Sequence, residues 1–116
     1  MNMTDWNNML EQTRAAIAGY EMALDSMGYS VMLQPYVIRC ENIPLAFDLV
    51  EVEPLNPRPV LPQLATRFTL QDAARIAPQV KNGNGARGEV VHVRHAIATA
   101  LANQRELLAL LLENTE

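Results

Sequence analysis

The hydrophobic positions of the chain predict two long helices, one near each end. Residues 89–113 contain no proline or glycine, and Gly88 stands just before them. Apolar side chains recur here at helical spacing, at Val90, Val93, Ile97, Leu101, Leu108 and Leu111. Toward the end, leucines occupy nearly every side of the helix, at Leu107, Leu108, Leu110, Leu111 and Leu112. Because a helix that is apolar all round must be covered all round, we expect neighbouring chain or a second copy to bury this ending.

The other long helix is predicted over residues 5–27. Its apolar stripe consists of Trp6, Met9, Leu10, Thr13, Ile17, Tyr20, Leu24 and Met27. Thr4 has the position of an N-cap, Asp5 lies in the first turn, and Gly28 follows as a C-terminal stop. Gly19 within the helix indicates a close crossing with another helix.

Between these helices the pattern changes to an alternation of apolar and polar residues, which predicts an antiparallel hairpin over residues 31–53. Pro35 would confine its first strand to a sheet edge or a bulge. Residues 41–44 have the composition of a turn, and a break in the alternation at Leu49 and Val50 indicates a bulge. A short helix over residues 45–50, with Pro44 at its first position, is the alternative.

A proline-rich stretch follows, with Pro54, Pro57, Pro59 and Pro62. This spacing predicts extended, polyproline-like chain. We interpret it as a stiff connector across the surface. The alternative is that the run PRPVLP binds an aromatic-lined groove, as proline-rich ligands do.

A short third helix is predicted to begin after Thr69, which has Asp72 three positions on, close to a capping box. Pro78 would end or kink this helix, and residues 81–88 form a flexible loop. The elements together predict an α+β fold in a single domain of residues 1–116. Its long terminal helices pack on a small antiparallel hairpin, and a mostly α fold is the alternative.

Composition agrees with one globular domain, because 49% of the residues are hydrophobic and 19% are charged. Charge is divided unevenly along the chain. Residues 1–56 hold two basic and eight acidic residues, a net charge of −6, and residues 57–116 hold seven basic and five acidic residues, a net charge of +2. We interpret the acidic and the basic part of the chain as two solvated faces of one domain. The alternative is that this uneven charge steers the approach of a binding partner.

The location of the protein is inferred from its cysteine content and its apolar runs. Cys40 is the single cysteine, so an internal disulfide is excluded. The first residues lack the basic start of a secretory signal, and no apolar run approaches the roughly 20 residues that span a bilayer. We therefore expect a cytoplasmic protein that makes no membrane contact.

Three glycines before the final helix, Gly83, Gly85 and Gly88, have the spacing of a dinucleotide-binding fingerprint. The fingerprint requires a buried parallel strand directly before it and an acidic residue about 20 residues further on. Here Pro78 and Lys81 precede the glycines, and no strand is expected after the helix. We interpret the segment as a mobile loop and expect no cofactor.

Glu89, His92 and His95 recur every three residues, so a helix would place them on one side of its first turns. The spacing is half of the pattern found in di-iron helix bundles, which needs a second copy and further carboxylates. Because the chain has two histidines in all, we favour structural roles for both and expect no metal site.

Residues 69–76 have the pattern of the first helix of a helix-turn-helix. Positive charge lies nearby, at Arg67, Arg75, Lys81, Arg87, Arg94 and Arg105. A turn of about 3–4 residues should then lead to a recognition helix, but the gap from Pro78 to Gly88 is longer. We expect no direct nucleic-acid binding, and a DNA-associated regulator of a phage or mobile element is the alternative.

The sequence contains no pattern that points to catalysis. Its serine and histidine residues lack a nucleophile-elbow context, and no motif joins Cys40 to His92 or His95. We therefore predict that the chain is not an enzyme and that it acts by binding a larger host protein.

The candidate contact residues fall into three sets. Acidic residues could present carboxylates where a partner expects phosphates, at Glu41, Asp48, Glu51 and Glu53. Arg87 and Arg94 are the basic candidates. Self-association into a homodimer is assigned to Leu107, Leu108, Leu111 and Leu112, because one small domain can hardly bury both sides of that helix.

The helix-first opening MNMTDWNNMLEQTRAAIAGYEMAL, the compact acidic domain and the lack of a catalytic set together resemble the small phage-encoded inhibitors called anti-CRISPR proteins. Such proteins share no signature motif, so no functional residue is carried over. The resemblance implies inhibition by covering a surface of a CRISPR–Cas effector, either its DNA-surveillance complex or its helicase-nuclease.

Overall fold

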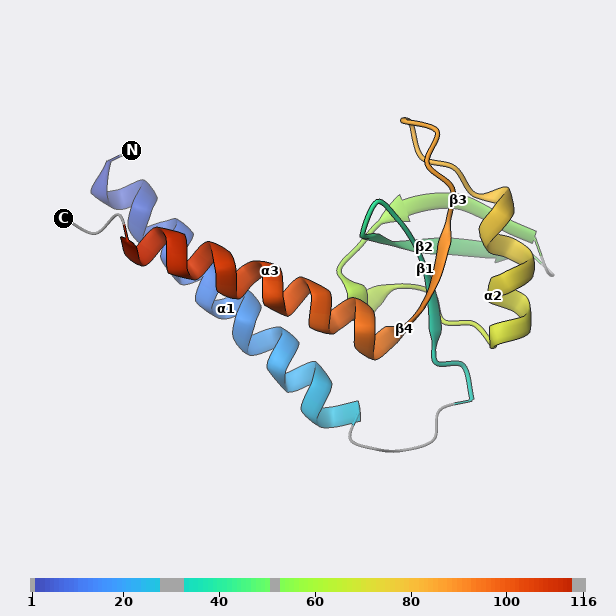
Figure 1. Cartoon of the computed structure of the whole chain (residues 1–116), viewed down its shortest axis with the longest axis horizontal. Coiled ribbons are helices and arrows are strands. Elements are labelled where there is room, and N and C mark those ends of the chain that lie inside the picture. Colours follow the sequence, from blue (N-terminus) through green and yellow to red (C-terminus); the bar gives the residue numbers. More distant parts are fainter. Residues whose placement is uncertain (1, 28–32, 51–52, 114–116) are drawn as a thin grey trace. The chain divides into compact units, whose positions relative to one another are not determined.

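The computed structural model of the chain confirms the α+β fold (Figure 1). It describes residues 2–27, 33–50 and 53–113, and the side chains described exclude those of residues 49–50 and 53–56. This part of the chain forms, in order, α1 (Met3–Met27), β1 (Tyr36–Cys40), β2 (Ile43–Val50), β3 (Glu53–Pro59), α2 (Leu70–Ile76), β4 (Glu89–His92) and α3 (Val93–Glu113). Two short 3-10 helices flank α2, at Pro62–Leu64 and Ala77–Gln79.

Contacts between Cα atoms divide the chain into two compact units. The helical unit comprises residues 1–29 and 97–116, and the sheet unit comprises residues 30–96. The division therefore falls within α3. A single domain over residues 1–116 stays a prediction.

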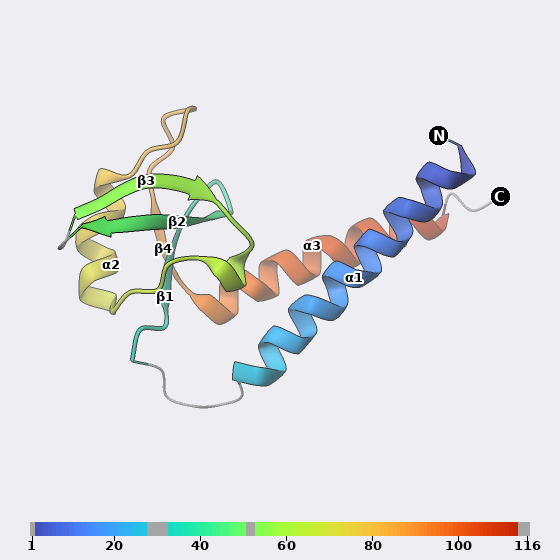
Figure 2. The same ribbon diagram turned by 180° about the vertical axis from the view of Figure 1, so that it is seen from behind.

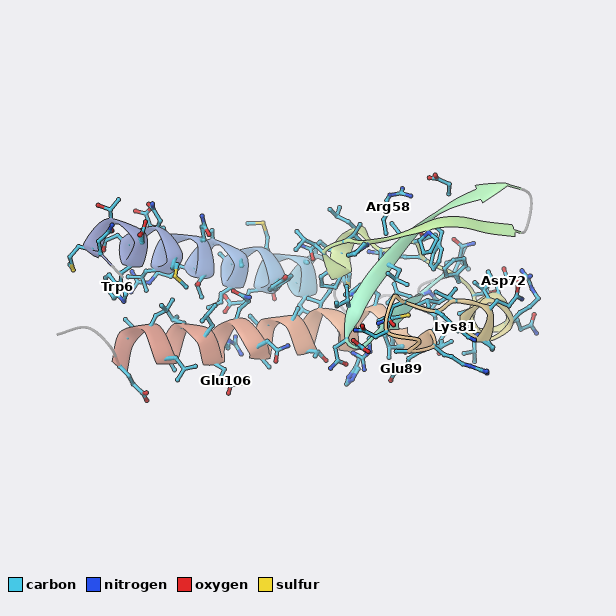
Figure 3. The ribbon with its side chains drawn as sticks, turned by 90° about the horizontal axis from the view of Figure 1, so that it is seen from above. Trp6, Arg58, Asp72, Lys81, Glu89 and Glu106 are labelled. Atoms are coloured by element: carbon cyan, nitrogen blue, oxygen red, sulfur yellow. The ribbon has the colours of Figure 1, made fainter. Side chains whose placement is uncertain are left out.

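The helical unit pairs α1 with α3 in antiparallel fashion. The indole Nε1 of Trp6, near the start of α1, donates a hydrogen bond of 3.1 Å to the carbonyl oxygen of Leu111, near the end of α3. Figure 3 shows Trp6 on the side of α1 that faces α3. The predicted stripe is confirmed at its buried centre, because Thr13 and Tyr20 are both buried. The Thr13 hydroxyl donates to the carbonyl oxygen of Met9, so its burial leaves the hydroxyl hydrogen-bonded.

The start of α1 differs from the prediction. The helix begins at Met3, and the Oδ1 atom of Asn2 accepts a hydrogen bond of 2.8 Å from the backbone N–H of Asp5. Asn2 therefore occupies the capping position that was assigned to Thr4, because asparagine is at least as strong an N-cap as threonine. The expected stop at Gly28 lies outside the described residues.

The sheet has the strand order β3-β2-β1-β4, and all its pairings are antiparallel. β1 and β2 are joined by the two residues Glu41 and Asn42, both with positive φ, as a tight type I′ hairpin turn requires. The predicted turn over residues 41–44 was thus too long. The bulge lies between Ala46 and Asp48 rather than at Leu49 and Val50. Because residues 43–44 pair with β1 and residues 45–50 pair with β3, the alternative of a helix over 45–50 is wrong.

The proline-rich stretch forms an edge strand, seen beside β2 in Figure 2. The expectation of polyproline-like connector chain was wrong for residues 54–59, because their backbone pairs with β2 from Leu45 to Leu49. The prediction missed this pairing because it is made with residues elsewhere in the chain. Prolines have no N–H to offer at the open side of an edge strand, so they discourage the addition of a further strand.

The beginning of the last predicted helix is a strand. Residues Glu89–His92 pair with β1, with Ile38 opposite Val90 and Val37 opposite Val91, and α3 begins at Val93. The spacing of Val90 and Val93 is compatible with a helix, but consecutive β-branched residues favour a strand when a partner strand is present. The helix was therefore predicted four residues too early.

α2 covers one face of the sheet over the core of the sheet unit. This core consists of Ile38, Cys40, Leu45, Phe47, Phe68, Ala73, Ile76, Ala77 and Val80. The rings of Phe47 and Phe68 meet edge to face with centroids 6.0 Å apart. The predicted cap of α2 is confirmed, because the Thr69 side chain accepts a hydrogen bond of 3.2 Å from the backbone N–H of Asp72.

Candidate functional site

Two turns meet at one end of the sheet unit, and we call them together the apex: residues 41–42 between β1 and β2, and residues 81–87 before β4. The side-chain Nδ2 of Asn84 donates a hydrogen bond of 3.4 Å to the carboxylate Oε2 of Glu41. The longer of the two turns extends beyond the sheet (Figure 1 and Figure 2). The apex thus brings the predicted contact residue Glu41 to the same end of the unit as Arg87.

The turn over residues 81–87 is held together by one asparagine. The Oδ1 atom of Asn82 accepts hydrogen bonds from the backbone N–H groups of Asn84, at 3.0 Å, and Ala86, at 2.9 Å. The backbone N–H of Asn82 donates to the carbonyl oxygen of Ala86, and its carbonyl oxygen accepts from the N–H of Gly85. The expected flexible loop is therefore a hydrogen-bonded turn. Sequence reasoning missed Asn82, although asparagine before glycine is a recognised signal for such local bonds.

Lys81 and Arg87 face each other across the base of this turn as partners in an antiparallel bridge. Like charges directly opposite each other in a bridge are destabilising. Both side chains are exposed, and neither forms an ion pair with a described residue. The apex therefore holds two exposed cations opposite each other, and neither has an ion-pair partner among the described residues.

The glycines near the apex have structural roles. Gly85 has a φ of +82°, which side chains rarely adopt, and its N–H closes the turn. A Cβ atom at Gly88 would lie 2.7 Å from the carbonyl oxygen of Ala77 and 2.9 Å from Ile38 Cγ2. Gly88 thus permits close packing against Ala77 and Ile38. The glycines therefore have roles in the turn and in packing, and they do not form a phosphate-binding loop between a strand and a helix.

The other predicted contact residues do not join the apex. Asp48 accepts a hydrogen bond of 3.1 Å from the guanidinium of Arg58, which lies on the neighbouring strand. Arg94 is half-buried at the start of α3, at the opposite end of β4 from Arg87. Glu51 and the side chain of Glu53 lie outside the described residues. The acidic candidates therefore do not form one array in the part of the chain that is described.

The expected placement of Glu89, His92 and His95 on one side of a helix is wrong, because Glu89 and His92 belong to a strand. Residues three apart in a strand point to opposite faces of the sheet. Glu89 accepts two hydrogen bonds from Arg39, of 3.2 Å and 3.3 Å, while the His92 ring lies edge to face with Tyr36. The His92 Nδ1 atom also accepts from the backbone N–H of Arg94. Among the described residues, no group of His, Cys, Asp and Glu is arranged to hold a metal ion.

Cys40 is the last residue of β1, and His92 on β4 lies beside the first residue of β1. His92 pairs with Tyr36, four residues from Cys40, which corresponds to about 13 Å along a strand. Burial raises the pKa of the Cys40 thiol, the charge of Glu41 raises it further, and a hydrogen bond from the backbone of Asn82 lowers it. The thiol is thus disfavoured as a nucleophile, and these two residues form no Cys/His pair.

An open depression in the sheet unit is lined by Leu33, Gln34, Arg67 and Thr69. The Thr69 hydroxyl already caps α2, and Leu33 is 90% exposed. These four residues therefore lack the grouping of acid, base and nucleophile that catalysis requires.

The helix-turn-helix pattern has no counterpart in the described residues. α2 is followed by a 3-10 helix, the turn of the apex and β4, and α3 begins only after that strand. The described residues also include no helix with the length and hydrophobicity needed to cross a bilayer.

The four leucines assigned to self-association occupy different sides of α3. Leu111 is buried, Leu107 and Leu108 are half-buried, and Leu112 is 44% exposed. Leu110, which was not assigned, is 51% exposed. The leucines at the C-terminal end of α3 therefore do not form a single exposed patch.

Comparison of the chain with protein-family models, with curated proteins and with solved structures finds no match.

Proposed function

We propose that the chain is a non-enzymatic binding protein that contacts a larger protein through the apex. The observation that carries this proposal is the bridge between Lys81 and Arg87, two exposed cations without an ion-pair partner among the described residues. An acidic surface on a partner would neutralise both charges and remove their mutual repulsion.

The rigidity of the turn supports this role. Its backbone is bonded to Asn82 at several points, and Asn84 ties it to Glu41 on the neighbouring turn. A contact surface that is ordered before binding loses less conformational entropy when the partner arrives. Glu41 supplies one negative charge at the same apex. It would repel carboxylates of a partner and so restrict the orientation in which an acidic surface binds.

The partner class follows the resemblance to anti-CRISPR proteins. We propose that the chain covers a surface of a CRISPR–Cas effector, either the DNA-surveillance complex or the helicase-nuclease, and thereby blocks its function. A protein partner is favoured over a small ligand because the apex projects from the sheet as a convex turn, whereas small-molecule sites are concave.

The test measures binding of the full chain to purified effector complexes by interferometry, together with target-DNA binding by those complexes. Lys81→Glu with Arg87→Glu is expected to weaken binding by about tenfold or more, which corresponds to roughly 1.4 kcal/mol. Arg67→Glu is the matched control, because Arg67 is another exposed arginine of the sheet unit without an ion-pair partner among the described residues. Equal losses in both variants would contradict a contact at the apex.

The second candidate function is a DNA-associated regulator of a phage or mobile element, because two adjacent cations also suit phosphate groups. Fluorescence anisotropy with duplex DNA at several salt concentrations separates the two functions. Two phosphate contacts would give a slope of log K against log salt of about −2. We expect no such binding, and a slope of this size that is lost in the Lys81→Glu, Arg87→Glu variant would favour the regulator instead.

A further inference from the structure

The longer turn of the apex contains two asparagines that are each followed by glycine, Asn82 before Gly83 and Asn84 before Gly85. In such a pair the backbone nitrogen of the glycine is a nucleophile close to the carbonyl carbon of the asparagine side chain. Glycine hinders the attack least, because it has no side chain of its own. Both pairs therefore share one chemistry, and the hydrogen bonds of the turn distinguish between them.

The side chain of Asn82 is held with its carbonyl group polarised. Its Oδ1 atom accepts hydrogen bonds from the backbone N–H groups of Asn84, at 3.0 Å, and Ala86, at 2.9 Å. Both donors follow Asn82 in the chain, so the carboxamide is turned toward the chain that begins with the nitrogen of Gly83. When a nitrogen adds to the Cγ atom, negative charge develops on Oδ1. Donors that already point at an atom where charge develops lower the barrier of the reaction.

The nitrogen of Gly83 is available as the nucleophile. Within the part of the chain that the structure describes, its N–H donates no hydrogen bond. Gly83 is exposed, and apart from its chain neighbours no atom lies within 4 Å of where its Cβ would be. Solvent therefore reaches this N–H group. The positive charges of Lys81 and Arg87 at the base of the turn favour the anion that forms when the proton leaves.

Asn84 is less suited to the same reaction. Its Nδ2 atom, which would be the leaving group, donates a hydrogen bond of 3.4 Å to the carboxylate of Glu41. The N–H of Gly85, which would supply the nucleophile, donates a hydrogen bond of 3.0 Å to the carbonyl oxygen of Asn82. Reaction at Asn84 would have to break both bonds, whereas reaction at Asn82 uses bonds that are already made.

We propose that Asn82 is a site of self-modification, at which asparagine is converted into aspartate and isoaspartate without an enzyme. The nitrogen of Gly83 gives its proton to hydroxide and forms a bond to Cγ of Asn82. The bond between Cγ and Nδ2 breaks, and Nδ2 takes a proton from water and leaves as ammonia. Water then adds to either carbonyl carbon of the resulting cyclic imide and opens it. The sequence of steps needs no oxidant or reductant.

Either product adds a carboxylate to the turn that carries Lys81 and Arg87. Together with Glu41, the apex then holds as many negative as positive charges. Aspartate keeps an oxygen that accepts from the backbone N–H groups of Asn84 and Ala86, and its charge strengthens those bonds. Isoaspartate instead carries the backbone through its Cβ atom, which displaces the acceptor and disrupts the turn. Conversion therefore weakens attraction to an acidic surface, a consequence that rests on the proposed function.

The test follows the mass gain of the full chain, NH replaced by O, during incubation at mildly alkaline pH. Trypsin cleaves after Lys81 and Arg87, so one peptide contains both candidate sites, and its fragment ions assign the gain to one asparagine. Asn82 is expected to react about tenfold faster than Asn84, because the bonded Oδ1 and the unbonded nucleophile both favour it. An unincubated sample digested in the same way corrects for reaction during digestion.

The chain unfolded in urea is the reference, because it keeps both asparagine–glycine pairs and lacks the turn. There the two sites are expected to react at similar rates, so a preference confined to the folded chain results from the turn. Gly83→Ala is expected to slow the reaction at Asn82 about tenfold, because the methyl group hinders the nitrogen while fitting into open space. Asn84→Gln is the matched control. It removes the other site and should leave the rate at Asn82 unchanged.

Binding to the purified effector complexes is then compared for fresh and incubated protein. Incubated wild type is expected to lose affinity in proportion to its conversion, whereas incubated Gly83→Ala should keep it. Absence of binding by the fresh protein would contradict the proposed function alone, because the mass gain is measured without a partner. Reaction at Asn84 as fast as at Asn82 in the folded chain would overturn the inference. An unmodified Asn82 after complete reaction of the unfolded reference would overturn it as well.

Discussion

The helical unit and the sheet unit place their charges differently. The helical unit carries a net charge of −5, whereas the sheet unit holds seven basic and six acidic residues, a net charge of +1. In the helical unit the ion pair of Glu21 with Arg105 is solvated, with side chains 50% and 59% exposed. In the sheet unit the Arg39 side chain is 8% exposed and bonded twice to Glu89. In the sheet unit, an ion pair whose guanidinium is nearly buried therefore contributes to the stability of the fold. In the helical unit, the charges of the ion pair are exposed to solvent and contribute little to it.

The two units also differ in how their backbones are specified. All seven prolines fall in the sheet unit, where they occur in strands, in 3-10 helices and just before β1, and the helical unit contains none. The helical unit depends on a repeating local pattern, whereas the sheet unit depends on pairings between distant residues. Substitutions are therefore expected to be most damaging where distant segments of the sheet unit touch.

The largest expected effect comes from Gly88, where the chain between α2 and β4 approaches the core. In Gly88→Ala the added Cβ would meet the Ala77 carbonyl oxygen at 2.7 Å, and a backbone atom cannot move aside cheaply. We expect a loss of about 2–3 kcal/mol in the free energy of unfolding, measured by urea denaturation. Gly83→Ala is the control, because nothing lies within 4 Å of that position, and its change should stay within about 0.5 kcal/mol. Equal effects in both variants would contradict the close packing of Gly88.

The next effect concerns the Arg39–Glu89 pair. Glu89→Gln removes the charge that faces a nearly buried guanidinium, while Glu89 itself is 58% exposed. Breaking a fully buried pair costs roughly 3–5 kcal/mol, and water around Glu89 reduces this, so we expect a loss of about 2 kcal/mol. Urea denaturation of the variant measures it, and a loss below about 0.5 kcal/mol would show that Arg39 needs no partner.

The buried hydroxyl of Tyr20 is expected to make the stability of the helical unit depend on pH. Burial raises the pKa of its hydroxyl above the ordinary value, because the buried phenolate is disfavoured. The folded state therefore holds the proton more tightly than the unfolded state. Stability should be unchanged below a pH of about 10 and should fall as pH rises through the raised pKa. Alkaline unfolding followed by circular dichroism measures this fall, and Tyr20→Phe should reduce it. An unchanged alkaline transition in that variant would exclude Tyr20 as its source.

The sequence predicted best the elements that depend on neighbouring residues. The stripe of α1 extends over enough turns to identify that helix, and Thr69 with Asp72 marks the start of α2 through a local bond. Thr4 was a reasonable cap for α1, but Asn2 offers the same chemistry two residues earlier. Such errors shift the end of an element without changing the fold.

The remainder could not be predicted because it depends on contacts between distant segments. Val90 and Val93 fit a helix by spacing, and only pairing with β1 makes residues 89–92 a strand. That change also places Glu89 and His92 on opposite faces of the sheet, whereas a helix would have placed them on one side. The apex depends on Asn84 reaching Glu41, 43 residues away in sequence. A single sequence gives no signal for that contact, although the N-G-N-G run does indicate the turn itself.

The smallest expected effect is at the solvated ion pair of the helical unit. Arg105→Gln removes a contact between side chains that are each half exposed or more, so screening by water leaves about 0.5 kcal/mol or less. A double-mutant cycle with Glu21→Gln measures the coupling, and added salt should reduce it further, because charges at the surface are screened over about 10 Å at 0.1 M. The same cycle on Arg39 and Glu89 should give a larger coupling that salt changes less. If the two couplings proved equal, the contrast between structural charge in the sheet unit and solvated charge in the helical unit would not hold.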